Sequence, residues 1–138
     1  MPKNDTIDTT VEILLAGDED VILARQKIRA ITQELGFGML DQTRIVTAAS
    51  ELARNIVVHA GQGKVVVEPL SSRPGIKIIF TDKGPGIADT SKAMQEGFST
   101  VGSMGLGLTG AKRLMDEFTL ESKPNNGTTV TVIKWLPE

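Results

Sequence analysis

Two pairs of strand-like segments place the strongest limit on how this chain can fold. The first pair, KVVVE at 64–68 and IKIIFT at 76–81, is joined by a short loop of Pro, Ser, Arg and Gly residues. The second pair, at 118–122 and 128–135, flanks the turn KPNNG. Short β-branched and apolar runs on either side of a turn are typical of β-hairpins. Because hairpin partners are antiparallel, the sequence favours a mixed, mostly antiparallel sheet over a doubly wound parallel one.

The segments around the hairpins predict one further strand and a set of helices. TTVEILL at 9–15 predicts a first strand at an edge of the sheet. Apolar residues with helical spacing predict a helix over 19–35, with Asp18 as its N-cap and Gly36 as its stop signal. Three more helices are predicted, one from its N-cap Asp41 to about Ala60, a short one over 88–96 before a lid-like loop, and one over 106–118. This order favours an α+β fold with its helices on one face of the sheet.

Length and composition fit a single domain over 1–138 with one hydrophobic core. The formal net charge is −2 and the basic residues are scattered, so we expect no nucleic-acid partner. The chain has no cysteine, which excludes disulfides and thiol catalysis. It shows no leader pattern and no apolar run of about 20 residues, so we expect no membrane association and a cytoplasmic location.

A glycine-rich stretch at 81–108 is the first sign of a ligand site. It begins TDKGPGIAD and ends GSMGLGL, so two glycine clusters bracket a segment of small and polar residues. Glycine lets backbone N–H groups approach a ligand closely. Each cluster alone is a weak signal, because Asp-Lys-Gly-Pro-Gly is also ordinary turn chemistry and a lone Gly-x-x-Gly-x-Gly is common. Another segment has to support the interpretation.

Glu51 and Asn55 provide that support. They are four residues apart on a predicted helix, so they are neighbours on one helix surface. They lie beside the predicted core stripe, which consists of Ile45, Ala48 or Ala49, Leu52 and Ile56. Taken alone, both could be solvated helix-face residues. The topology, however, can bring this pair and both glycine clusters to one edge of the helical layer.

The chemistry of the three segments suits a nucleotide. A carboxylate at a strand end, such as Asp82, can accept from an exocyclic amino group, while Gly84 and Gly86 let the backbone pass close to a flat base. The alternative for Asp82 is that it only starts a turn. The second cluster, at 102–107, precedes or begins a helix, where free N–H groups and the helix dipole favour phosphate.

Glu51 and Asn55 suit the two further requirements of a triphosphate site, which are a metal ligand and a proton acceptor. Asn55 can supply an amide oxygen to Mg²⁺, a hard cation that prefers oxygen ligands. Glu51, one turn away, can receive a proton from an attacking hydroxyl or water.

Four motifs in order resemble those of the gyrase, Hsp90, histidine kinase and MutL (GHKL) ATPase superfamily. They are Glu51-Leu-Ala-Arg-Asn55, Asp82-Lys-Gly84-Pro-Gly86, Gly102-Ser-Met-Gly105-Leu-Gly107 and Gly127-Thr128-Thr129. Within that superfamily the segments ELGFGMLDQTRIVTAASELARNI, FTDKGPGI, GFSTVGSMGLGL and KRLMDEF resemble the serine kinases of bacterial partner-switching systems, in particular the RsbT type. The similarity extends over nearly the whole chain.

This resemblance implies a two-layer α/β sandwich of the Bergerat (GHKL ATPase) kind that binds ATP with Mg²⁺. It implies phosphorylation of a serine or threonine on STAS-domain antagonist and scaffold proteins, as in a stressosome. The released kinase would then activate a downstream effector such as a phosphatase.

Residue roles follow from the same resemblance. Asp82 would recognise adenine with the help of the Gly86 turn and Thr128, Asn55 would hold Mg²⁺, and Glu51 would be the general base. The phosphates would be wrapped by the second glycine cluster, that is Gly102, Ser103, Gly105, Leu106 and Gly107. Arg25 matches a partner-contact position of related anti-sigma kinases. His59, the only histidine, fits a structural or surface residue at a helix C-terminus better than a phospho-acceptor.

Two hypotheses of function remain open from the sequence. The first is an ATP-dependent protein serine/threonine kinase of a partner-switching pathway. The second is a nucleotide-gated anti-sigma or adaptor module that acts by sequestration with little or no catalysis. Both require the nucleotide site around Asp82.

Overall fold

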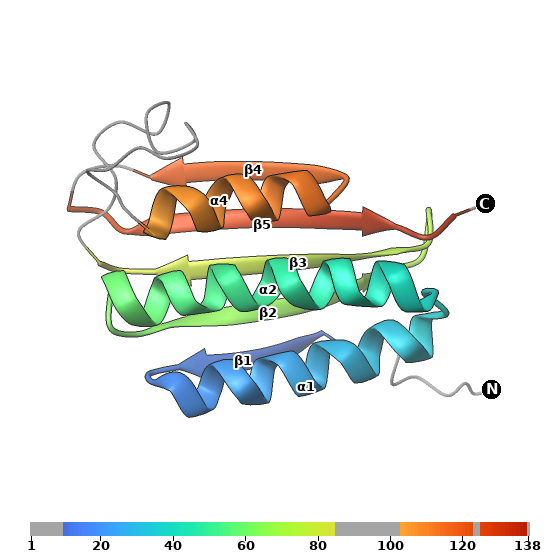
Figure 1. Ribbon diagram of the computed structural model, residues 1–138, viewed down its shortest axis with the longest axis horizontal. Helices are drawn as coiled ribbons and strands as arrows, with labels where there is room; N and C mark the ends of the chain where they lie inside the picture. The colour runs from blue at the N-terminus through green and yellow to red at the C-terminus, as the bar shows by residue number, and fades with distance from the viewer. Residues whose placement is uncertain (1–9, 85–102, 123–124, 138) are drawn as a thin grey trace.

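The structure is a computed structural model that describes residues 10–84, 103–122 and 125–137, with only the backbone at 103–106 (Figure 1). The helix predicted over 88–96 and the lid-like loop lie outside these residues. The described elements occur in the predicted order. They are β1 (Val11–Leu15), α1 (Asp18–Leu35), α2 (Met39–His59), β2 (Gly63–Leu70), β3 (Gly75–Asp82), α4 (Ser103–Leu114), β4 (Glu117–Ser122) and β5 (Thr128–Trp135).

The five strands form one sheet in the order β1-β2-β3-β5-β4. Both predicted hairpins are present, as β2–β3 and β4–β5, and β1 is an edge strand as predicted. The pairing of β3 with β5 joins the two halves of the chain. All four pairings are antiparallel, so the expectation of a mixed sheet was wrong for the described strands.

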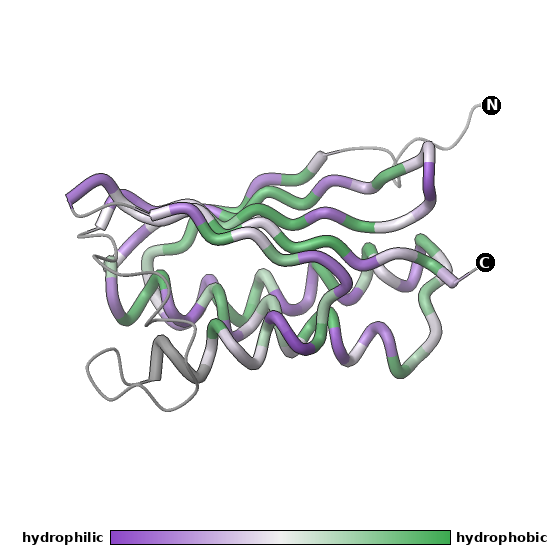
Figure 2. The backbone as a smooth tube through the Cα atoms, turned by 90° about the horizontal axis from the view of Figure 1, so that it is seen from above, coloured by the Kyte–Doolittle hydropathy of each residue, from purple (hydrophilic) through white to green (hydrophobic). Residues whose placement is uncertain are grey.

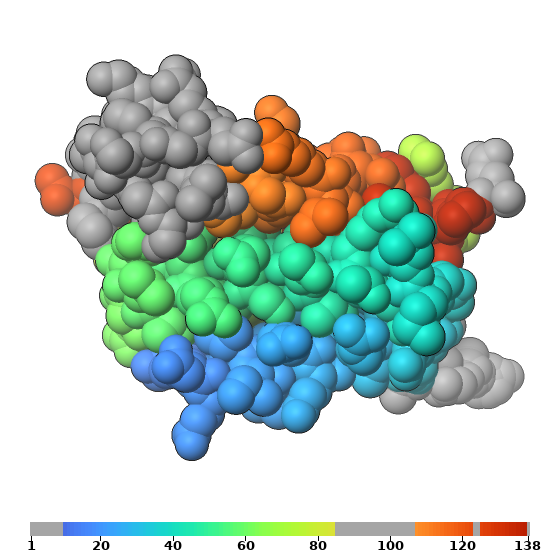
Figure 3. All heavy atoms as spheres, viewed as in Figure 1, coloured from blue at the N-terminus to red at the C-terminus, as the bar shows by residue number. Residues whose placement is uncertain are grey.

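The three described helices cover one face of the sheet, which confirms the two-layer α+β fold (Figure 2). They pack side by side with α2 in the middle (Figure 3). The core fills the space between the layers, because alternate strand residues such as Ile78 and Val132 are fully buried against helix residues such as Ile28, Ile45 and Leu52. None of the described helices is both long and apolar enough to cross a bilayer.

Both predicted N-caps were wrong by a short distance. The residues that cap α1 and α2 are Gly17 and Gly38, and neither helix has a side-chain cap. Asp20, inside the first turn of α1, instead accepts a hydrogen bond of 2.8 Å from the backbone N–H of Ala16. The acidic residues therefore act within the first turn, where they still favour the helix dipole. The predicted stop at Gly36 is confirmed, since its φ of 94° is left-handed.

The predicted end of α4 was also wrong, because the helix ends at Leu114 rather than 118. The backbone N–H of Asp116 donates to the carbonyl of Ile133 at 2.9 Å, and its carboxylate accepts from the backbone N–H of Trp135 at 2.8 Å. These bonds turn the chain into β4 at Glu117. Pairing with β5 thus overrides the helical pattern of the sequence.

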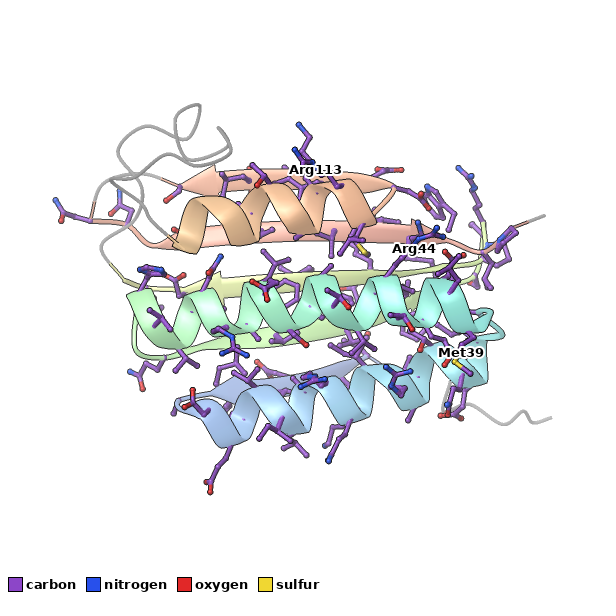
Figure 4. All side chains as sticks on the ribbon, in the orientation of Figure 1. Met39, Arg44 and Arg113 are labelled. Atoms are coloured by element: carbon purple, nitrogen blue, oxygen red, sulfur yellow. The ribbon has the colours of Figure 1, made fainter. Side chains whose placement is uncertain are left out.

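An ion cluster ties the N-terminal end of α2 to the last hairpin. Asp41 pairs with Arg44 at 2.8 Å and lies 3.9 Å from Lys134, which in turn pairs with Asp116 at 3.3 Å. The side chains of Lys134 and Asp41 are only 12% and 17% exposed, so this cluster is screened less than a surface pair. Arg44 lies beside the N-terminal part of α2, on the side toward β5 (Figure 4). The cluster occupies the end of the molecule opposite the C-terminal end of α2.

Candidate functional site

One row of residues crosses the sheet at the end where β3 stops and β5 starts. The register pairs Gly63 with Asp82, Asp82 with Thr128, and Thr128 with Ser122. Strand residues two apart face the same side, so this row faces the helices as the buried residues Phe80 and Val130 do. The row therefore lies under the C-terminal end of α2 and the N-terminal end of α4 (Figure 1).

A pocket opens over this row between the sheet, α2 and α4. Three of its lining residues are polar, and they come from three segments far apart in the sequence: Asn55, Asp82 and Thr128. The others are apolar and are Leu52, Ile56, Phe80, Leu108 and Val130. An apolar wall with a few converging polar groups is typical of a small-molecule site.

Asp82 both shapes a turn and faces the pocket. Its Oδ1 atom accepts a hydrogen bond of 2.8 Å from the backbone N–H of Gly84. A Cβ atom at Gly84 would lie 2.6 Å from the Cβ of Ala60 and 3.2 Å from Asp82 Oδ1, so only glycine fits there. The turn interpretation and the ligand interpretation of Asp82 are therefore compatible, because one carboxylate oxygen holds the turn and the other is left for a further donor.

Asn55 lies where α2 and α4 approach each other. A Cβ atom at Gly107 would lie 3.0 Å from Nδ2 and 3.2 Å from Oδ1 of Asn55, so the glycine makes room for the amide. Nδ2 is buried and has no hydrogen-bond partner among the residues that the structure describes. A buried amide nitrogen that has no partner among the described residues, in the wall of a pocket, is a donor that a ligand can satisfy.

Gly127 fixes the approach of the last hairpin to Asp82. Its φ of 80° is left-handed, and a side chain there would collide with the carbonyl oxygen of Asp82 and come within 2.9 Å of Lys83 Cα. The next residue, Thr128, hydrogen-bonds through its Oγ1 to Ser122 Oγ at 2.8 Å. The threonine of the predicted Gly-Thr-Thr motif is thus held beside Asp82.

Glu51 lies one turn before Asn55 on α2 and is half-buried, as Asn55 is. This position at the margin of the core is the predicted one. Glu51 is not among the eight residues that line the described pocket. Its part in the chemistry therefore stays a prediction.

The second glycine cluster coincides with the start of α4, which begins at Ser103 rather than at the predicted 106. Ser103, Gly105 and Leu106 thus belong to the first turn or so of a helix whose N-terminus lies at the pocket end (Figure 1). Such a helix start favours phosphate. Gly86 and Gly102 lie outside the described residues.

Two further predicted residues lie apart from the pocket lining. Arg25 is exposed on α1 and lines a separate hollow with Ile22, Gln26, Arg29 and Val46. His59 lies in the last turn of α2 and is half-buried.

Five of the pocket residues were not predicted as site residues, and neither was Ser122, the partner of Thr128. Leu52 and Ile56 were predicted only as part of the core stripe of α2. Phe80 and Val130 lie two positions from Asp82 and Thr128 on the same strands, so the period of two could have identified them. Leu108 lies one position after Gly107 and could be found only from the packing of α4. No sequence signal indicated Ser122, because its partner is set by strand register.

Known proteins are similar to this chain in sequence and in fold. The family model described as histidine kinase-, DNA gyrase B-, and HSP90-like ATPase matches residues 40–138. Serine/threonine-protein kinase RsbT of Bacillus subtilis (strain 168) is 54% identical over 119 residues, which cover 85% of this chain and 90% of RsbT. The anti-sigma F factor of Thermoanaerobacter sp. (strain X514) is 31% identical over 128 residues, covering 88% and 90% of the two chains.

Two solved structures share the fold at low sequence identity. A crystal structure of the RsbU and RsbW domains of a Mycobacterium tuberculosis protein matches with a TM-score of 0.67 and 21% identity, covering 93% of this chain and 32% of that one. The histidine kinase domain of a blue-light activated histidine kinase from Erythrobacter litoralis matches with a TM-score of 0.54 and 18% identity, covering 86% and 60%.

Proposed function

Because the chain belongs to the histidine kinase-, DNA gyrase B- and HSP90-like ATPase family, and within it resembles RsbT along most of its length, we infer that it is an ATP-binding protein serine/threonine kinase of a partner-switching pathway. The observation that carries the nucleotide site is the meeting of Asn55, Asp82 and Thr128 in one pocket beside the start of α4. The reaction class rests on the relatives.

In this proposal Asp82 reads the base. A carboxylate has only acceptors, so it suits the exocyclic amino group of adenine, and Thr128 lies beside it in the same row. The apolar side chains of Phe80, Leu108 and Val130 would cover the faces and edge of the base. Gly84 and Gly86 would shape the turn next to it, and the start of α4, with Gly102, Ser103, Gly105, Leu106 and Gly107, would hold phosphate.

The residues present fit a magnesium ion held mainly by ATP itself. The described residues contain no cluster of three or more His, Cys, Asp or Glu side chains that could hold a metal. Asn55, with a buried amide that can present either its nitrogen or its oxygen, would supply one ligand, and phosphate oxygens and water the rest. When bound, the ion neutralises charge on the phosphates.

Glu51 is proposed as the general base. The serine or threonine oxygen of the partner forms a bond to the γ-phosphorus while the bond from that phosphorus to the β–γ bridging oxygen breaks. The hydroxyl proton passes to the Glu51 carboxylate, and ADP leaves. The position of Glu51 one turn from Asn55 supports this role, since it holds the carboxylate on the same helix surface as the proposed Mg²⁺ ligand.

Gly107 and Gly110 of α4 form a matched pair for testing the role of Asn55. A Cβ at Gly107 would force the Asn55 amide to shift, whereas a Cβ at Gly110 meets nothing within 4 Å. We expect Gly107→Ala to weaken ATP binding measured with Mg²⁺ by about tenfold or more, as loss of ligand support does in other metal sites. We expect Gly110→Ala to keep the affinity and to raise stability by about 0.4–1 kcal/mol. Nucleotide titration and thermal unfolding measure both, and equal ATP affinities in the two variants would contradict the role of Asn55.

The proposed substrates are STAS-domain antagonist and scaffold proteins, with a phosphatase-like effector acting downstream and the cytoplasm as the location. The test is mass spectrometry of a STAS-domain protein after incubation with this chain and Mg·ATP. We expect one added phosphoryl group on a serine or threonine, and none when ADP replaces ATP. A stable complex that contains no phosphorylated residue would support the sequestering adaptor module instead.

A further inference from the structure

We propose that Ser122 is a positioning residue that fixes the hydroxyl proton of Thr128 and so makes Thr128 a hydrogen-bond acceptor toward the ligand. The proposal rests on the nucleotide site proposed above. It concerns how that site distinguishes one purine from another. Ser122 itself is the partner of Thr128 in the β4–β5 pairing and does not line the pocket.

Two contacts of the Ser122 hydroxyl set the direction in which its proton points. Ser122 Oγ donates to the carbonyl oxygen of Gly127 at 2.9 Å and lies 2.8 Å from Thr128 Oγ1. A carbonyl has no proton to give, so the first bond can be made in only one direction. A serine hydroxyl has one proton. Once that proton is directed at Gly127, the bond between the hydroxyls is made only if Thr128 donates to Ser122.

The reverse arrangement is less favourable. If Ser122 donated to Thr128, the carbonyl of Gly127, a buried residue, would lose this donor. Withdrawing a partner from a buried polar group costs free energy, whereas the first arrangement makes both bonds. The Thr128 hydroxyl therefore donates its proton to Ser122. Toward the pocket, the oxygen of Thr128 can act only as a hydrogen-bond acceptor.

The consequence is a patch of two acceptors side by side. Asp82 and Thr128 are directly paired across β3 and β5, and both line the pocket. A 6-aminopurine satisfies such a patch, either directly or through a water that donates one proton to Thr128 and the other to the base. A 6-oxopurine presents a carbonyl oxygen where only acceptors face it, and sites that leave buried polar groups unmatched discriminate strongly.

The test compares ATP with inosine triphosphate, which carries oxygen in place of the 6-amino group. Removing the Ser122 hydroxyl frees Thr128 to rotate and donate to that oxygen. We expect the wild-type chain to prefer ATP, and Ser122→Ala to reduce the ratio of the two dissociation constants by about tenfold, the size of one neutral hydrogen bond. Ser122→Thr, which keeps the hydroxyl, should restore the wild-type ratio. Thr129→Ala is the matched control, because Thr129 is adjacent but on the opposite face of the sheet.

Nucleotide binding and phosphoryl transfer are measured separately, so two failures can be told apart. If the wild-type chain binds neither nucleotide, the proposed function is overturned together with this role. If it binds ATP but Ser122→Ala keeps the wild-type ratio, only the role of Ser122 is overturned. Thermal unfolding shows whether each variant is folded. Should Ser122→Ala fail to fold, Ser122→Cys, with a weaker donor of similar size, is expected to lower the ratio, and an unchanged ratio in that variant would overturn the proposal.

Discussion

Glu51→Gln is expected to slow phosphoryl transfer by about 10²- to 10⁴-fold, the usual contribution of a general base. The glutamine keeps the size of the side chain but cannot take the proton of the attacking hydroxyl. ATP affinity should be unchanged, because Glu51 is not among the residues that line the described pocket. Single-turnover transfer to a STAS-domain partner and a separate nucleotide titration measure the two effects.

A second variant controls for the loss of one negative charge. Glu19 is an exposed carboxylate in the first turn of α1, and Glu19→Gln should leave the transfer rate as it is. Wild-type transfer by Glu51→Gln would remove Glu51 from the mechanism and leave the nucleotide site intact.

Asp82→Asn is expected to weaken ATP binding by about 10- to 100-fold, the range for a hydrogen bond to a charged group. The turn should survive, because the side-chain oxygen of asparagine can still accept from the N–H of Gly84. What changes is the group that meets the base, since an amide nitrogen would place donors against the amino group of adenine. Nucleotide titration measures the affinity, and thermal unfolding checks the fold.

Asp116→Asn is the matched control, because it is expected to affect stability and not ATP affinity. Asp116 lies in the ion cluster with Lys134, away from the pocket. Its replacement should lower stability and leave ATP affinity unchanged. If Asp82→Asn bound ATP as tightly as the wild type, the nucleotide site would be wrong, and with it both the kinase and the adaptor hypotheses.

Local sequence patterns were enough to predict most of the fold. The two hairpins and the long helices depend on turns and on apolar spacing, which are properties of neighbouring residues. Apart from the expectation of a mixed sheet, the errors lie at the ends of elements. An acidic residue stabilises a helix either as its N-cap or within its first turn. The sequence alone therefore did not show which of these two positions Asp18 and Asp41 occupy. The end of α4 was missed because distant pairing with β5 decides it.

The site was less predictable than the fold. That Asn55 and Glu51 share a helix surface follows from their spacing. That Thr128 lies opposite Asp82 follows only from the register of β3 against β5, which no local pattern sets, so the sequence indicated it through family resemblance alone. The position of Ser122 beside Thr128 depends in addition on the register of β4 against β5. The roles of these residues in binding and transfer stay predictions.

The pairing of β3 with β5 has a consequence for the stability and lifetime of the folded protein. It is the only described strand pairing that joins residues before 85 to residues after 102, and the pocket lies across its end. A nucleotide bound at the proposed site would bridge two halves of the chain that must separate when the protein unfolds. At a concentration 100 times its dissociation constant, a ligand adds about 2.7 kcal/mol to the free energy of unfolding. The cell's ATP supply would thus act on the abundance of the kinase as well as on its activity. The form without nucleotide unfolds more readily, and proteases degrade the unfolded chain.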